Sequence, residues 1–353
     1  MRVNRILTET WLHRGLLAWT LRPVAGLYSL LVRLRWLAYR LNWLKTERLN
    51  IPVLVVGNVV AGGAGKTPLV IALIKHFQAS NVAVAVVSRG YGRVHDASIE
   101  VHLTTPVSAS GDEPALIKLA TNAPVFVANK RVDAVRCMLQ AYPEAALVIC
   151  DDGLQHYALH RDIEIAVFDD RGIGNGWLLP AGPLREPWPA RQARGIDLVL
   201  HTGQVPAFQG FTSRRQLATF ARAADGSKTP LAELQGQPLI ALAGIATPHA
   251  FFSMLRSRGL HLQKTFVLPD HHHFQEWETN FFAADCLNHT VLCTEKDAIK
   301  LFSLNIPSTQ KVLAVPLEFT PELDFFKALD TLVEPLLQGA NSQVPSSDGH
   351  QID

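Results

Sequence analysis

Short, continuously apolar runs alternate with longer stretches of helical periodicity from residue 51 to residue 201. The runs are rich in Val and Ile and span 51–57, 82–88, 124–128, 146–150, 163–168 and 196–201. Continuously apolar strands that alternate with helices are typical of a mostly parallel sheet with helices on both faces. The pattern therefore predicts an α/β fold built on such a sheet.

The same alternation resumes after a polar stretch near 202–235, which is the expected junction between two α/β units. Apolar segments of the second unit lie at 237–245, 264–270, 289–297 and 311–319. The last residues contain little apolar surface to bury and are expected to be disordered. We therefore predict four parts: a basic helical segment 1–48, a first α/β domain 49–205, a second and smaller α/β domain 206–338, and a disordered tail 339–353.

Residues 10–45 are predicted to be helical, with a break near Pro23. Arginines recur on one stripe, and leucine and tryptophan cover most of the remaining surface. One interpretation is an amphipathic helix lying in a membrane interface, and the other is an ordinary helix packed on the protein's own core. The longest apolar run of this segment, 23–32, is shorter than the roughly 20 residues that span a bilayer.

Charge is distributed unevenly over the 353 residues, whose formal net charge is only +2. Residues 1–48 contain nine Lys and Arg but two acidic residues, so the rest of the chain is acidic on balance. A small net charge predicts no nucleic-acid partner, whereas the basic N-terminal segment indicates a specific one. The four cysteines form no CxxC pair and favour a reducing compartment.

A glycine-rich turn follows the run at 51–57 and precedes an apolar helical stretch. It ends in Gly65, Lys66 and Thr67, the core of a phosphate loop of the form G-x-x-x-x-G-K-[ST], but Val60 occupies the first glycine position. In such a loop, amides and the lysine bind phosphate oxygens, and the threonine hydroxyl binds Mg²⁺. The predicted nucleotide-binding residues are Val60, Ala61, Gly62, Gly63, Ala64, Gly65, Lys66 and Thr67.

Asp151 and Asp152 directly follow the apolar run at 146–150. Phosphate-loop proteins hold Mg²⁺ with a carboxylate at the end of a neighbouring strand, so both residues are candidate magnesium ligands. Residues 129–133 do not match the guanine-binding pattern N-K-x-D, because Val132 occupies the aspartate position. ATP is therefore the predicted nucleotide.

Two further polar segments are candidates for the acceptor side of the site. Asp112 and Glu113 lie in a predicted loop flanked by Gly and Pro, where a carboxylate could accept a proton from a hydroxyl. Three consecutive histidines, His271 to His273, follow Asp270. Their spacing does not match a zinc site, and a histidine that assists proton transfer is the preferred interpretation.

Several motifs occur together in a fixed order: GNVVAGGAGKTP, SRGYG, GDEP, DDGLQH, RGIGNGWLLPAGPLREP, PDHHHF and TEKDAIK. In this combination the chain resembles the tetraacyldisaccharide 4′-kinases, the lipid A 4′-kinases of Gram-negative bacteria. The resemblance extends from about residue 10 to residue 335, and the family also lacks the first loop glycine.

The resemblance implies a kinase on the cytoplasmic face of the inner membrane, with an N-terminal membrane helix and two α/β domains joined by a β-ribbon. It would transfer the γ-phosphate of ATP, with Mg²⁺, to the 4′-hydroxyl of a tetraacyl glucosamine disaccharide 1-phosphate, the lipid A precursor. Asp112 falls on the family's base and His271 on the histidine that supports it, while His272 stays an alternative. Less specifically, the resemblance places four residues along the substrate site: Tyr91, Glu113, Arg131 and Gln155.

Two other functions remain open from the residues alone. A membrane-recruited regulatory ATPase would hydrolyse ATP without an acceptor, but ATPases with the loop K-G-G-x-G-K-T have a lysine where this chain has Ala61. A kinase of soluble small molecules would not need the basic N-terminal segment. Transfer of labelled phosphate to a panel of acceptors separates the three functions.

Overall fold

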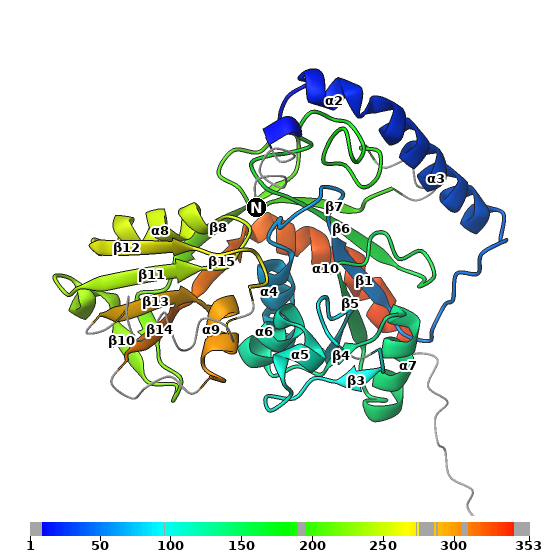
Figure 1. Cartoon of the computed structure of the whole chain (residues 1–353). Coiled ribbons are helices and arrows are strands. Elements are labelled where there is room, and N and C mark those ends of the chain that lie inside the picture. The colour runs from blue at the N-terminus through cyan, green and yellow to red at the C-terminus, as the bar shows by residue number, and fades with distance from the viewer. Residues whose placement is uncertain are drawn as a thin grey trace, which may run out of the picture.

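Two β-sheets organise the chain in the computed structural model, and the N-terminal helices run along the outside of the larger sheet's unit (Figure 1). The structure describes residues 9–94, 96–189, 195–272, 274, 286, 289–304 and 310–341. The predicted disordered tail begins too early, because residues 339–341 belong to the last described helix, which spans Leu323–Asn341; the tail from 342 onward lies outside the described residues.

The larger sheet has the strand order β15-β8-β7-β6-β1-β5-β2-β4-β3 in the described part of the chain. Its strands are β1 (Val53–Gly57), β2 (Val84–Ser88), β3 (Ile99–Glu100), β4 (Val125–Val127), β5 (Leu147–Asp151), β6 (Ile163–Phe168), β7 (Leu198–His201), β8 (Phe211–Leu217) and β15 (Leu317–Pro321). Neighbouring strands from β8 to β4 pair in parallel, and only β15 and β3 at the two edges are antiparallel. The predicted mostly parallel sheet is confirmed.

Successive residues of β1 point to opposite faces of this sheet, and both faces are buried. Leu54 and Val56 pack with α4 (Lys66–Ala79), α6 (Asp112–Thr121) and α10 (Leu323–Asn341), whereas Val53 and Val55 pack with α7 (Arg131–Ala141). Burial on both faces is why the strands are continuously apolar. The carboxyl ends of β1, β5 and β6 meet at one edge, where ligands bind in open α/β sheets.

The smaller sheet has the order β10-β9-β14-β13-β11-β12 in the described residues. Its elements are β9 (Phe220–Arg222), β10 (Lys228–Pro230), η1 (Leu231–Leu234), β11 (Leu239–Ala243), α8 (Pro248–Ser257), β12 (Leu262–Val267), β13 (Thr290–Thr294), α9 (Glu295–Leu301) and β14 (Val312–Val315). Helix α8 covers one face, and α9 covers the other. Helix α9 also packs against α6 of the larger unit, which brings the two units together at one place (Figure 1).

The chain crosses between the two sheets twice, and the crossings are adjacent. It leaves the larger sheet after β8 and returns into β15, its antiparallel partner. The amide of Ala218 donates to the carbonyl of Pro316 at 2.9 Å, so the crossings are bonded to each other. From the predicted second domain, 206–338, the elements β8, β15 and α10 lie on the larger sheet.

The N-terminal segment forms α2 (Leu16–Thr20) and α3 (Arg22–Arg40). Pro23 lies in the first turn of α3, where no amide donor is needed, so the break falls at Leu21 just before it. In these two helices only Ala18 and Ala25 are buried. Among the helices of the described residues, none combines the length and the apolar character that a membrane span requires.

Candidate active site

The predicted phosphate loop connects the carboxyl end of β1 to the first turn of α4. Gly62 and Gly65 have φ of +99° and +81°, a conformation that favours glycine. Val60, at the first glycine position, does not have a positive φ. It is buried and forms an isolated β-bridge with Leu184. This pairing explains why the loop keeps its course with valine at the first glycine position.

Asn58 fixes the loop from inside. Its side-chain amide donates to the carbonyls of Val60 and Gly62, and its Oδ1 accepts from Lys66 Nζ at 3.2 Å. The side chain is fully buried. One asparagine thus sets both the path of the loop and the direction of its lysine.

Residues that directly follow β6 and β7 hold the backbone of the loop. Arg171, paired with Asp169 at 2.8 Å, donates to the carbonyls of Ala61 and Gly63 at 3.3 and 3.1 Å. The hydroxyl of Thr202 donates to the carbonyl of Ala64 at 2.8 Å. Carbonyl oxygens do not bind anions, so the backbone amides and Lys66 are the groups with which the loop can bind one at the start of α4.

The two consecutive aspartates at the end of β5 have different environments. Asp152 lies 3.5 Å from Lys66 and 3.4 Å from Arg185. Its burial alone would raise its pKa, but the charges of Lys66, Arg185 and Arg131 outweigh burial and lower it. Asp152 is therefore an anion matched to the loop lysine.

Asp151 is fully buried and has one engaged oxygen, which accepts from the hydroxyl of Ser88 at 3.4 Å. Its Oδ1 finds no hydrogen-bond partner among the described residues. Burial, together with the charges of Glu113 and Asp152, raises the pKa of Asp151 to about 7. A buried carboxylate oxygen left without a partner beside a phosphate loop fits a hard cation such as Mg²⁺.

Magnesium at this site would need ligands beyond the protein carboxylates. Within the described ranges, no three His, Cys, Asp or Glu side chains gather into a cluster that could hold a metal ion. Mg²⁺ typically uses one or two carboxylates together with substrate phosphates and water. Asp151 with the hydroxyl of Thr67 on the loop is consistent with that mode.

Arg131 and Gln155 lie against the back of this cluster. Arg131 donates to the carbonyl of Asp152 at 3.1 Å, and Gln155 donates to the carbonyl of Asn58 at 3.2 Å. Arg185 lies 3.5 Å from the side-chain oxygen of Gln155. Of the four predicted substrate-site residues, the structure thus brings Arg131 and Gln155 into contact with the loop and the aspartates.

Asp112 and Glu113 form the first turn of α6, although the sequence indicated a loop. Gly111 precedes them with φ of +85°, and Pro114 lies within the first turn, where its missing amide costs nothing. Carboxylates in a first turn are favoured by the positive end of the helix. The helix gives Asp112 a fixed direction that a loop would not.

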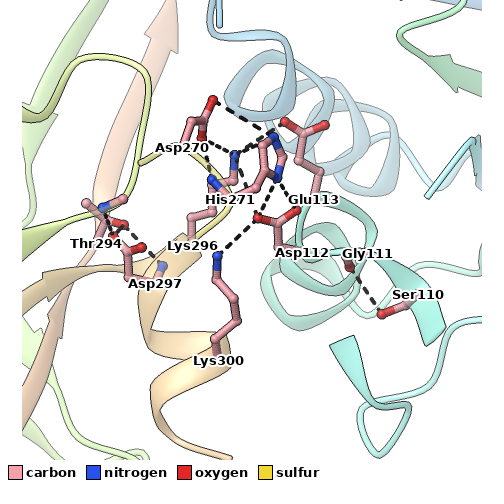
Figure 2. A network of polar contacts seen from close by, with 11 residues as sticks. Ser110, Gly111, Asp112, Glu113, Asp270, His271, Thr294, Lys296, Asp297 and Lys300 are labelled. Carbon is pink, nitrogen blue, oxygen red and sulfur yellow. Dashed lines mark hydrogen bonds and ion pairs between the residues drawn. The ribbon is translucent and has the colours of Figure 1, made fainter. Parts of the chain in front are cut away.

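The carboxylate of Asp112 meets His271 across the gap between the two units (Figure 2). The Nδ1 atom of His271 lies 2.9 Å from both carboxylate oxygens, and the Asp112 residue is only 5% exposed. The ring of Tyr91, which is 67% exposed, lies 5.3 Å from the His271 ring. His272 instead packs edge-on against Phe274, so His271 is the histidine in contact with Asp112; His273 lies outside the described residues.

Two lysines of α9 complete the surroundings of Asp112. Lys300 and Lys296 lie 3.4 and 3.8 Å from its carboxylate. Burial alone would raise the pKa of Asp112, but the hydrogen bond from His271 and the two ammonium charges outweigh it and hold this pKa well below the usual range. The same hydrogen bond raises the pKa of His271. Asp112 is therefore an ionised, buried carboxylate able to accept a proton.

A phosphate loop with Lys66 in place, beside a buried carboxylate–histidine pair, defines the protein as a phosphate-loop enzyme of the phosphoryl-transferring class. The sequence matches the family model of the tetraacyldisaccharide-1-P 4′-kinases (LpxK) over residues 17–334. The chain belongs to this family, so the prediction of a kinase of lipid A biosynthesis is confirmed.

Relatives match over nearly the whole chain. The tetraacyldisaccharide 4′-kinase of Polaromonas naphthalenivorans (strain CJ2) is 64% identical over 99% of both chains. That of Verminephrobacter eiseniae (strain EF01-2) is 47% identical over 100% of this chain and 80% of its own. The crystal structure of LpxK from Aquifex aeolicus in complex with ATP has a TM-score of 0.77 at 28% identity, covering 91% of this chain and 100% of that one. This likeness confirms the predicted fold class.

Replacing Asn58 with alanine should lower kcat/KM for ATP by about 10- to 100-fold, because two loop carbonyls and Lys66 lose a buried partner, and leaving a buried polar group without its partner costs about 1–3 kcal/mol. Steady-state kinetics with varied ATP measure the effect. The matched control is Asn50→Ala at an exposed asparagine outside the loop. Equal kinetics for the two variants would show that the loop does not depend on Asn58.

Proposed function

We propose that the protein transfers the γ-phosphate of ATP to the 4′-hydroxyl of a tetraacyl glucosamine disaccharide 1-phosphate at a membrane surface. The observation that carries the proposal is the buried Asp112 carboxylate, both oxygens of which lie 2.9 Å from Nδ1 of His271 in the other unit. Membership of the tetraacyldisaccharide-1-P 4′-kinase family, and the relatives that bear this name, support the acceptor.

The phosphate loop would hold the triphosphate of ATP with the amides of residues 60–65. Lys66 would neutralise charge on the transferred phosphoryl group, and positioning with charge neutralisation is most of what this reaction needs from a protein. Mg²⁺ would be held by Thr67 with Asp151 and Asp152, and it would supply further positive charge at the phosphates.

Asp112 would act as the general base for the acceptor. The 4′-oxygen attacks the γ-phosphorus, the bond to the ADP oxygen breaks, and the hydroxyl proton passes to Asp112. His271 orients the carboxylate and shares the proton through Nδ1. Tyr91, Glu113, Arg131 and Gln155 are proposed to line the substrate site; of these, Tyr91 is the exposed side chain beside His271.

A regulatory ATPase accounts less well for this arrangement. Hydrolysis needs only a positioned water, whereas here a carboxylate of one unit is completed by a histidine and two lysines of the other. A base assembled between two units suits a large acceptor that enters between them. The lipid acceptor also gives a reason for the apolar surface of α3.

Helix α3 presents leucines to the outside along one stripe. Leu27, Leu30 and Leu34 are 60%, 52% and 51% exposed. The helix is fastened to the body next to the site: Tyr28 donates to the carbonyl of Arg185, and Arg35 donates to that of Gln155. An interfacial helix held there would bring the site to the surface that contains the acceptor.

Asp112→Asn should lower kcat for transfer by at least about 100-fold, within the range of general-base effects, while KM for ATP changes little. Labelled ATP with the tetraacyldisaccharide 1-phosphate in detergent measures the effect. Asp225→Asn, at an exposed aspartate, is the control. Label found only in inorganic phosphate with wild-type protein would favour the regulatory ATPase. Loss of ATP affinity without loss of kcat would make Asp112 a binding residue.

Substituting Gln for Leu27, Leu30 and Leu34 together should reduce flotation with anionic vesicles and transfer to a vesicle-embedded acceptor. The contacts of Tyr28 and Arg35 are kept, so transfer to the detergent-dispersed acceptor should persist. Wild-type flotation should also weaken with added salt, because arginine–headgroup attraction is screened. Leu323→Gln, at an exposed leucine of α10, is the control. Unchanged flotation of the triple variant would remove the membrane role from α3.

A further inference from the structure

Lys296 contacts the proposed base, the two other carboxylates near it, Glu113 and Asp270, and His271. We propose that Lys296 is a positioning residue for phosphoryl transfer, whose ammonium group keeps the Asp112–His271 pair in the form that accepts a proton. The inference rests on the proposed role of Asp112 and adds a residue of the smaller unit to that function.

The ammonium group of Lys296 lies among three carboxylates and one imidazole (Figure 2). Its Nζ is 3.0 Å from Asp270, 3.7 Å from Glu113 and 3.8 Å from Asp112. It is also 3.4 Å from Nε2 of His271. The side chain is 15% exposed, so water screens these contacts only in part. Lys296 thus connects α6 of the larger unit to Asp270 and His271 of the smaller one.

The charges explain why a cation is needed at this point. Asp112 and Glu113 are consecutive in one helical turn, and Asp270 approaches them from the other unit. Carboxylates gathered in a partly buried site repel one another and favour protonation, and a protonated Asp112 cannot act as a base. Lys296 contacts all three carboxylates and offsets that repulsion.

Lys296 itself stays charged in this setting. Burial alone would lower its pKa, but the neighbouring carboxylates outweigh burial and raise it. Lys300 is the second cation facing Asp112, at 3.4 Å, and it lies over the ring of Phe274. Of the two lysines, Lys296 also contacts His271, Glu113 and Asp270.

The first turn of α9 is fixed to the smaller sheet, which holds Lys296 in place. The carboxylate of Asp297, fully buried, accepts from the amide of Gly244 at 3.0 Å and from the hydroxyl of Thr294 at 2.7 Å. Thr294 in turn caps α9 by accepting from the amide of Asp297. A charged side chain on such a rigid turn is placed with little loss of entropy when the site forms.

The test is the pH profile of kcat for transfer, measured for wild type and for Lys296→Met. Removing a nearby positive charge favours the protonated forms of the Asp112–His271 pair, so the apparent pKa values of the pair should rise by about 1–3 units. The acidic limb should therefore move toward neutral pH, while KM for ATP stays unchanged because Lys296 is not assigned to the nucleotide.

Lys296→Arg keeps the charge and should return the acidic limb toward its wild-type position. Lys311→Met, at an exposed lysine, should leave the profile unmoved. Melting curves show whether each variant is folded, and Lys296→Gln replaces Lys296→Met if that variant does not fold. A uniform loss of kcat with an unmoved limb, or a raised KM for ATP alone, would overturn the inference.

Asp112→Asn, assayed in parallel, separates this inference from the proposed function. If Asp112→Asn abolishes transfer and the limb of Lys296→Met is unmoved, only the role of Lys296 is wrong. If Asp112→Asn retains full transfer, the proposed base is wrong, and the role of Lys296 falls with it.

Discussion

The contact between Asp112 and His271 is the interaction on which the working arrangement of the site depends. A carboxylate so deeply buried would hold its proton if it stood alone, because burial disfavours its charged form. The partners that keep it ionised, namely His271, Lys296 and Lys300, all belong to the smaller unit. The ionised state of Asp112, the proposed base, therefore depends on contact between the two units, and the hydrogen-bonded crossings at Ala218 and Pro316 hold the units beside each other.

The contacts that shape the phosphate loop, by contrast, all come from residues of the larger unit. Asn58 and Arg171 shape the loop through its carbonyls, and Lys66 finds its counter-ion in Asp152. The pKa of Asp152 is lowered, whereas that of Asp151, one residue earlier, is raised, because burial and the charge of Glu113 favour its protonated form. Glu113 stands next to Asp112, the proposed base, in the same first turn of α6.

Much of this architecture is predictable from the sequence, because a strand buried on both faces must be apolar throughout. The runs at 51–57 and 146–150 locate β1 and β5, and with them the loop and the aspartates. The crossings were not predictable in the same way: β8 has the sequence FTSRRQL, and its half-exposed face leaves no apolar run to detect.

Two residues of the site, Asn58 and Lys296, were not predicted from the sequence, for a different reason. Asn58 acts on backbone carbonyls, and Lys296 contacts side chains that are distant in the sequence. No rule of residue spacing predicts either kind of contact. TEKDAIK supported the family resemblance, yet only the packing of α9 on α6 shows that its first lysine reaches Asp112. Val60 was an apparent defect of the loop until its pairing with Leu184 showed that glycine is not needed there.

A double-mutant cycle on kcat for lipid phosphorylation tests the central claim most directly, namely that one base is built from residues of both units. The variants are Asp112→Asn, His271→Gln and the two combined, all assayed at saturating ATP. Residues that act as one unit show strongly non-additive effects, so the double variant should be about as slow as Asp112→Asn alone. Losses that multiply in the double variant would show that Asp112 and His271 act independently, and would contradict the account.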